Sequence, residues 1–331
     1  MGETGSDWEG VELHVVTGKG GTGKTTVAAA LALALAAGGR RTLLCEVEER
    51  QGIAQLFDVP PLPYDERRVA IAPRGGEVYA LAIDPQQALL EYLAMFYKLG
   101  RAGRALDRIG AVDFATTIAP GLRDVLLTGK VYEAVGRRRG GRRDYNAVVM
   151  DAPPTGRITR FLNVNAEVSG LARVGPIHGH AESIMRLLRS PRTAVHIVTL
   201  LEEMPTQETV DAVTELHTAG LHVGGIFVNR VRRPPLGKKE LLAVRKGQLS
   251  ADAVEDGLAA AGVNGAGTPH LATALLDEAY ELGERVALEE RERRTIKSLA
   301  RPTYELPDLA DGVDVGALYE LAEDLTDQGA A

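Results

Sequence analysis

A glycine-rich segment near the start of the chain has the residue types that bind phosphate. GKGGTGKTT occupies residues 18–26 and fits the pattern G-x-x-x-x-G-K-[ST]. Glycines let backbone N–H groups close around a phosphate, and the first turn of a following helix adds partial positive charge. A lysine placed like Lys24 bridges the β- and γ-phosphates, and a hydroxyl placed like Thr25 binds Mg²⁺. We predict that a nucleotide is bound by Gly18, Lys19, Gly20, Gly21, Thr22, Gly23, Lys24, Thr25 and Thr26.

One carboxylate could complete this phosphate site. Asp151 lies at the end of the apolar run NAVVMDA (146–152), which is typical of a buried strand. A carboxylate at that end of a strand can hold hydrated Mg²⁺ beside Thr25, most directly through water. An Asp after a strand also commonly caps a turn or a helix, so a structural cap is the alternative interpretation.

The elements that position these residues alternate between strands and helices. The run VELHVVT (11–17) precedes the loop, and a helix over 25–37 follows it and ends at two glycines. Further predicted strands cover 41–48, 77–83, 146–152, 194–201 and 222–229. Alternation of this kind predicts an α/β fold, a P-loop NTPase with a mostly parallel sheet and helices on both faces. The basic run RRRGGRR (137–143) is interpreted as a solvated loop.

Composition and charge limit the class of protein. The chain has 331 residues, of which 45% are hydrophobic, so it can bury a sizeable core. Its net charge of 38 − 45 = −7 argues against general binding to nucleic acid. Cys45 is the only cysteine, so a disulfide framework is excluded and a reducing, cytoplasmic compartment fits best. The longest apolar stretch is too short to span a bilayer, so any membrane contact would be peripheral.

The loop KGGTGKTT (19–26) resembles that of the deviant Walker A ATPases, which include the ParA, MinD, nitrogenase iron protein and ArsA types. In that group an early lysine, here Lys19, reaches across a dimer interface to the partner's nucleotide; a solvated loop lysine is the alternative. DAPPTGR (151–157) resembles the switch II segment of the ArsA family, although that family has a histidine where this chain has an arginine. The resemblance implies that the γ-phosphate is contacted by Pro154, Thr155 and Gly156.

The switch I segment departs furthest from the ArsA family. EVEERQGIAQLF (46–57) aligns Glu48 with the family's Asp, the presumed base or water-positioning residue. A Glu adds one methylene, and a displacement near 1 Å can cost on the order of 10²-fold in rate. The alternative is that Glu48 forms salt bridges within an acidic cluster with Glu46 and Glu49.

Three more positions are assigned by resemblance alone. IFVNRV (226–231) is similar to the segment in which Asn229 would contact adenine, and Glu202 falls where a nucleotide-contacting Glu is expected. YELP (304–307), read as a loop, resembles the adenine-lining segment of the family and adds Pro307.

Together these motifs identify the chain as a member of the ArsA/guided-entry type ATPase family, closest to actinobacterial "anion-transporting ATPase" proteins. The resemblance implies that the chain binds ATP and Mg²⁺ and forms a homodimer or a heterodimer with a related ATPase chain. It also implies that the chain acts on a protein client or a membrane partner. It implies no zinc and no arsenite site, because both sites need cysteines that this chain lacks.

The domain organisation follows from the same comparison. We expect a disordered lead-in over 1–10 and a single P-loop ATPase domain over 11–327. Helical insertions are expected around 85–140 and 159–190, with a helical segment over 236–300.

Three functions are compatible with these features. The first is an ATPase whose dimer opens and closes around a client or membrane-associated partner. The second is a nucleotide-binding scaffold or regulatory subunit with little turnover, which Glu48 in place of Asp would favour. The third is a ParA/MinD-like partitioning switch, which neither the net charge nor the acidic tail supports.

Overall fold

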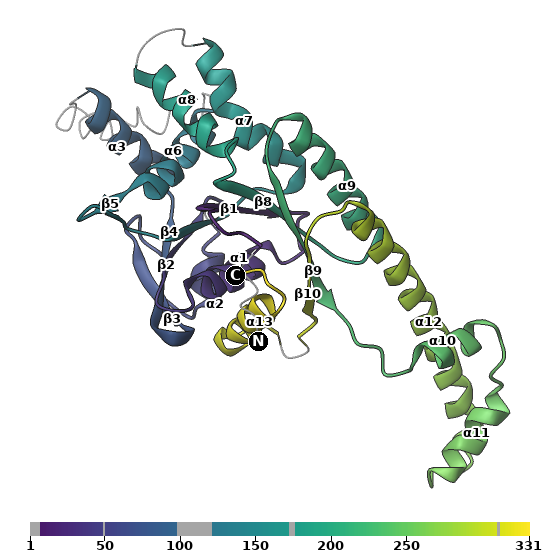
Figure 1. Cartoon of the computed structure of the whole chain (residues 1–331). Coiled ribbons are helices and arrows are strands. Elements are labelled where there is room, and N and C mark those ends of the chain that lie inside the picture. The colour runs from purple at the N-terminus through teal and green to yellow at the C-terminus, as the bar shows by residue number, and fades with distance from the viewer. Residues whose placement is uncertain (1–6, 49, 98–120, 172–175, 310–311) are drawn as a thin grey trace.

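The computed structural model describes residues 7–48, 50–97, 121–171, 176–309 and 312–331 (Figure 1). Eight strands form one sheet in the order β10-β9-β8-β1-β7-β2-β4-β3. Neighbours in this sheet are parallel except β3, which is antiparallel to β4. The predicted α/β fold with a mostly parallel sheet is therefore confirmed. Its strands are β1 (Leu13–Gly18), β2 (Arg41–Glu46), β3 (Arg67–Ala72), β4 (Gly76–Ala82), β7 (Ala147–Asp151), β8 (Thr193–Thr199), β9 (Val223–Val231) and β10 (Thr303–Pro307).

Helices cover both faces of this sheet, as expected for strands that are apolar along their whole length. One face is covered by α1 (Lys24–Ala36), α2 (Gly52–Leu56) and α13 (Val315–Asp327), whose apolar residues share one core with the sheet. α1 has almost no polar face, because every residue from Val27 to Ala36 is buried. The second face is covered by α6 (Leu122–Gly136), α7 (Thr155–Leu171), α8 (Pro176–Leu188) and α9 (Glu203–Thr218).

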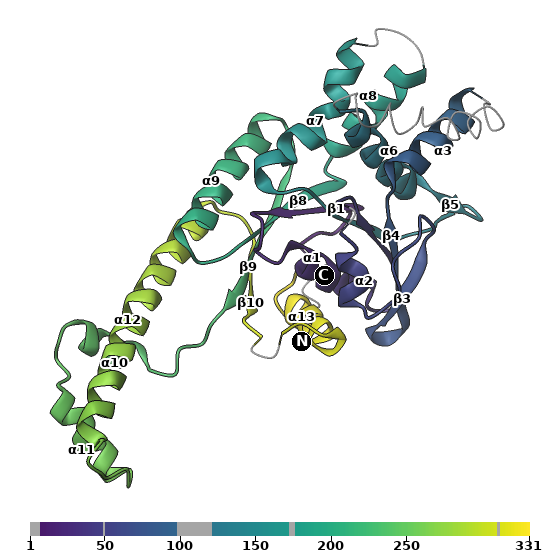
Figure 2. The ribbon, with the colours of Figure 1, turned by 180° about the vertical axis from the view of Figure 1, so that it is seen from behind.

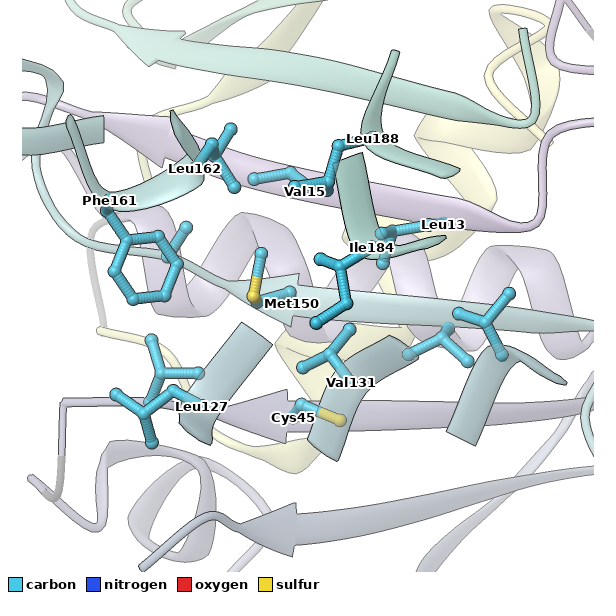
Figure 3. Packing of buried hydrophobic residues seen from close by; sticks show 14 of the residues in the cluster. Leu13, Val15, Cys45, Leu127, Val131, Met150, Phe161, Leu162, Ile184 and Leu188 are labelled. Carbon is cyan, nitrogen blue, oxygen red and sulfur yellow. The ribbon is translucent and has the colours of Figure 1, made fainter. Parts of the chain in front are cut away.

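The core on the second face contains the single thiol. Cys45 of β2 lies close to Met150 of β7 and Val131 of α6 in Figure 3. Burial raises the pKa of the Cys45 thiol well above its ordinary value. Cys45 is thus a buried, unreactive part of the core, as expected from its strand.

Two groups of helices extend beyond the sheet (Figures 1 and 2). α3 (Pro85–Tyr97) lies with α6, α7 and α8 at one end of the molecule. After β9 the chain forms an arm of three helices, α10 (Lys238–Arg245), α11 (Ala251–Ala260) and α12 (Thr268–Ser298), which projects away from the sheet. No helix in the described part of the chain is long and apolar enough to cross a membrane.

Residues 7–10, the described part of the segment expected to be a disordered lead-in (1–10), are packed against the sheet. Trp8 meets His196 edge to face with ring centroids 4.8 Å apart. The Tyr304 hydroxyl donates to the Asp7 carboxylate at 2.7 Å. An aromatic contact and a hydrogen bond to β10 therefore hold residues 7–10 against the sheet, while residues 1–6 lie outside the described ranges.

Candidate functional site

The glycine-rich loop connects β1 to α1 at the carboxyl edge of the sheet. A Cβ on Gly18 would lie 2.2 Å from the carbonyl oxygen of Val198, so no side chain fits there. Gly23 has φ of +88°, and a Cβ on it would lie 2.3 Å from the Asn229 amide nitrogen. Only glycine fits at these two positions, because neighbouring atoms approach the backbone too closely for a side chain and Gly23 has a positive φ. Thr22 supports the turn, because its hydroxyl donates to the Lys19 carbonyl at 2.8 Å.

Two predicted metal ligands meet at the start of α1. The Thr25 hydroxyl donates to Oδ2 of Asp151 at 2.6 Å. Oδ1 of Asp151 is buried and has no hydrogen-bond partner among the described residues. Burial raises the pKa of Asp151 to about 6, although the Thr25 hydrogen bond and the Lys24 charge lower it. A buried carboxylate with one free oxygen beside a hydroxyl is a donor set that suits a hydrated Mg²⁺.

Lys24 lies close enough to this pair to interact with the Asp151 charge. Its side chain is buried, and desolvation lowers the pKa of its ammonium group while the charges of Asp151 and Glu48 oppose that shift. Lys24 is therefore held among carboxylates at the start of α1. No three His, Cys, Asp or Glu side chains in the described ranges gather as a complete metal site. A magnesium ion here would depend on phosphate oxygens and water for its remaining ligands.

A second carboxylate, Glu46, was not predicted. It ends β2 directly opposite Asp151 in the strand register and is buried. Its two oxygens accept hydrogen bonds from the backbone N–H groups of Gly52 at 3.1 Å and Ile53 at 3.4 Å. Glu46 thereby fixes the start of α2, where a Cβ on Gly52 would lie 3.3 Å from the Thr25 methyl. A polar residue that ends an apolar strand, as Asp151 does, is the sequence signal that could have found it.

Glu48 lies in the segment that Glu46 fixes. Its carboxylate is 3.7 Å from the Arg50 guanidinium, and its charge acts on both Lys24 and Asp151. The structure thus places Glu48 near the phosphate site. Its ion-pair partner, Arg50, has a side chain that is 72% exposed. Glu49, the third member of the acidic cluster, lies outside the described residues.

The segment after β7 is hydrogen-bonded to β1 and to the neighbouring helix α9. The Thr17 hydroxyl donates to the Pro153 carbonyl at 2.7 Å. Pro154 precedes α7, and Thr155 and Gly156 form its first turn. The Thr155 hydroxyl donates to the Glu208 carboxylate of α9 at 3.0 Å.

Glu208 also binds the first lysine of the loop. Lys19 Nζ lies 2.8 Å from Oε1 of Glu208, so one carboxylate joins Lys19 to Thr155. Sequence reasoning selected Glu202 from this region and missed Glu208, because no local pattern connects it with Lys19. The two lysines of the loop have different partners: Lys24 lies with Asp151, and Lys19 lies with Glu208.

A cavity of about 280 Å³ lies beside the loop. Glu202 and Asn229 line it together, as do Arg230 and Arg232. The Asn229 amide donates to the Thr22 carbonyl at 2.9 Å, which connects the cavity wall to the phosphate loop.

Pro307 lies at the edge of this cavity. It ends β10 opposite Val231, which also lines the cavity. The neighbouring Asp308 carboxylate accepts hydrogen bonds from Arg230 at 3.0 Å and Arg232 at 2.7 Å. Of the three residues assigned by resemblance alone, Glu202 and Asn229 line the cavity, and Pro307 is the strand partner of a third lining residue, Val231.

A glycine loop between a first strand and its helix, with a threonine–aspartate pair at the carboxyl edge of a parallel sheet, defines a P-loop nucleotide hydrolase. The sequence profile of the anion-transporting ATPase family, ArsA_ATPase, matches residues 11–190. The chain belongs to that family, and it is an ATPase that binds and hydrolyses ATP.

Named relatives support this placement. ATPase BagA of Mycobacterium tuberculosis is 55% identical over 97% of this chain and 94% of its own length. The arsenical pump-driving ATPase of Escherichia coli is 30% identical over 66% of this chain and 34% of its own length. That of Acidiphilium multivorum is 26% identical over 72% of this chain and 42% of its own length. The chain therefore spans less than half of these two pump ATPases.

Proposed function

We propose that the chain works as a dimer whose nucleotide state opens and closes it around a client or a membrane-associated partner. The second subunit is another copy or a related ATPase chain. One observation carries this proposal: the two loop lysines point to different partners, with Lys24 among the carboxylates of its own site and Lys19 on Glu208 of α9. A single loop does not bring both ammonium groups to one γ-phosphate, so a second subunit is the simpler source of the extra cation.

The metal site of this proposal consists of Thr25 and Asp151. The Thr25 hydroxyl and the Asp151 carboxylate, which lie 2.6 Å apart, would hold a hydrated Mg²⁺ beside the phosphates. When bound, the ion neutralises charge that develops on the phosphate oxygens. The buried Oδ1 of Asp151, which has no hydrogen-bond partner among the described residues, supports this role, because it offers an oxygen ligand beside the Thr25 hydroxyl.

Three side chains would act on the γ-phosphate side. Glu48 orients the attacking water, which its electrostatic influence on Lys24 and Asp151 supports. Lys24 bridges the β- and γ-phosphates, and Lys19 of one subunit reaches the nucleotide of the other. For that reach Lys19 must exchange Glu208 for phosphate.

The base would lie in the cavity beside the loop. Asn229 would face the adenine edge there, with Glu202 on the cavity wall and Pro307 paired with the lining residue Val231. Asn229 also holds the Thr22 carbonyl, so base binding and loop geometry are linked through one side chain.

Release of Glu208 would connect hydrolysis to motion. Because Glu208 binds Lys19 and Thr155 together, a Lys19 that moves to a phosphate frees the first turn of α7. The Pro154–Gly156 segment then follows the γ-phosphate, and α7 transmits the change to the helices around it.

A mixing experiment tests the dimer mechanism. Lys19→Ala and Lys24→Ala chains, each inactive alone, are combined and ATP turnover is measured. A mixed dimer has one intact loop opposite one intact Lys19, so activity partly returns; a cation supplied in trans is worth roughly 10³–10⁵ in rate. Doubling the concentration of either variant alone serves as the control. The proposal is wrong if the mixture stays inactive while mixed dimers form, or if Lys19→Ala alone keeps full turnover.

A further inference from the structure

The arm formed by α10, α11 and α12 leaves much apolar surface uncovered. α11 has no buried residue, although Val254, Leu258 and several alanines lie on it. α12 has 31 residues and buries only Thr268, Ala272, Gly283, Glu292 and Ile296. At 1.5 Å per residue a helix of this length extends about 46 Å. Figures 1 and 2 both show α11 and the start of α12 far from the sheet, so the body of this chain does not cover them.

An apolar groove runs along this arm. Its volume is about 470 Å³, and its lining includes Leu236, Val254 and Leu282. Two of its leucines are exposed, Leu249 at 36% and Leu275 at 38%. Single exposed leucines are ordinary, but a groove with exposed leucines on its rim is typical of an interaction site.

More exposed apolar residues lie near the groove. Val263 is 44% exposed, Leu271 41% and Tyr280 48%. All three lie in the distal half of the arm, between the end of α11 and the middle of α12.

The distal half of the arm is also uniformly acidic. From residue 247 to residue 284 the sequence contains no lysine and no arginine. Its charged residues are Asp252, Glu255, Asp256, Asp277, Glu278, Glu281 and Glu284. Glu278 lines the groove itself, and Glu240 joins it from α10. Over residues 236–284 the eight acidic residues outnumber the four basic ones, which lie on or directly after α10 (Lys238, Lys239, Arg245 and Lys246). Arg245 already pairs with Glu284 at 2.6 Å, so negative charge predominates on the α11 and α12 sides of the groove.

We propose that this groove binds an amphipathic helix of a partner protein whose apolar stripe is flanked by lysine or arginine. A helix in a groove inserts side chains at i, i+3, i+4 and i+7, and basic residues beside that stripe would face Glu278 and its acidic neighbours. The charge argues against two other occupants. The arm of a second copy carries the same negative charge, and an anionic lipid surface would be repelled. The groove is distinct from the nucleotide site, although α12 lines both, with Leu282 in the groove and Arg285 in the cavity beside the phosphate loop. The proposal stands independently of the dimer mechanism.

The test uses the full chain and designed peptides. A Leu–Lys peptide of about 18 residues with leucines at i, i+3, i+4 and i+7 is compared with a Leu–Glu peptide of the same pattern and with a scrambled Leu–Lys peptide. Binding is measured by fluorescence anisotropy at about 0.15 M salt, where diffuse charge attraction is screened. We expect the Leu–Lys helix to bind and the other two peptides to bind at least about tenfold more weakly.

Matched variants locate the site. Leu275→Asp and Leu249→Asp place a charge on exposed groove residues, so the fold is retained and Leu–Lys binding falls by about tenfold or more. Ile71→Asp is the control, because Ile71 is 57% exposed on β3 at the far edge of the sheet. E278K should weaken Leu–Lys binding and strengthen Leu–Glu binding.

Three results would overturn the proposal. One is equal binding of the patterned and scrambled Leu–Lys peptides. Another is unchanged binding in both groove variants while circular dichroism shows them folded. The third is a Leu275-dependent self-association, by sedimentation, that persists when the peptide is in excess, since that result would assign the groove to a second copy.

Discussion

Replacing Asp151 with Asn should make the nucleotide-free protein more stable while it abolishes activity. Burial raises the pKa of Asp151 from its ordinary 3.8 to about 6. The folded state therefore binds a proton more tightly than the unfolded chain, and the ionised carboxylate destabilises the fold. The contribution of Asp151 to stability is complete below pH 3.8 and is lost as the pH rises through 6.

The size of the effect follows from this difference. About two pKa units at 1.36 kcal/mol each correspond to about 3 kcal/mol at pH 7.5. At pH 5.0 the unfolded chain is mostly ionised and the folded site mostly protonated, and the same relation gives about half that value. Asn can still accept the Thr25 hydrogen bond through its amide oxygen, so that contact does not offset the gain. Removal of the carboxylate takes away a metal ligand, and Mg²⁺-dependent ATP hydrolysis should be lost.

Urea unfolding of metal-free protein at both pH values measures the gain. Asp144→Asn is the matched control, because Asp144 is also buried but lies 2.9 Å from the Arg41 guanidinium. Loss of a carboxylate that pairs with a cation should destabilise the fold. An Asp151→Asn protein that is no more stable than wild type at pH 7.5, or equally stabilised at both pH values, would refute the reasoning.

Three further results are expected. Glu208→Gln should free Lys19 and raise ATP turnover severalfold. The free energy of unfolding should change by at most about 1 kcal/mol, because the side chains of this ion pair are a third exposed. Unchanged turnover would count against the role proposed for the Lys19–Glu208 ion pair. His14 and His196 are buried and hydrogen-bonded to each other, and burial lowers the pKa of both. The protein should therefore lose about 3 kcal/mol of stability between pH 7.5 and 5.5, as the unfolded histidines gain protons. That loss should be absent from the double Gln variant in urea titrations. Arsenite and antimonite should leave ATPase rates unchanged, since Cys45 is a buried thiol and a metalloid site needs several thiolates; stimulation that survives Cys45→Ser would contradict this argument.

Strands buried on both faces could be predicted from the sequence, whereas edge strands could not. The six predicted strands are continuous apolar runs and form six neighbouring strands of the sheet. β3 begins with Arg67 and Arg68, and β10 ends with Pro307, so neither has that pattern. Proline is tolerated there because an edge strand has N–H groups that need no partner. The basic run 137–143 forms the hairpin of β5 (Arg138–Arg139) and β6 (Arg142–Arg143), not a plain loop, and its two positive-φ glycines were the overlooked signal.

The candidate site likewise contains residues that the sequence predicts and residues that it does not. A local pattern located the phosphate loop and the Thr25–Asp151 pair, because strand, loop and helix are adjacent in sequence or end at one sheet edge. Glu46 and Glu208 were missed, since their partners lie on other elements of the fold. The Lys19–Glu208 pair joins residues that are far apart in sequence, and only the folded sheet brings them together.

Calorimetric titration of ATP with Mg²⁺ into three proteins tests the central claim most directly. Wild type should bind the nucleotide, and Lys24→Ala should lose binding because Lys24 lies in the site with Asp151. Lys19→Ala, altered in the same loop, should retain binding, because Lys19 lies on Glu208 and acts in hydrolysis across the dimer. Unchanged affinity in Lys24→Ala would contradict the assignment of the phosphate site.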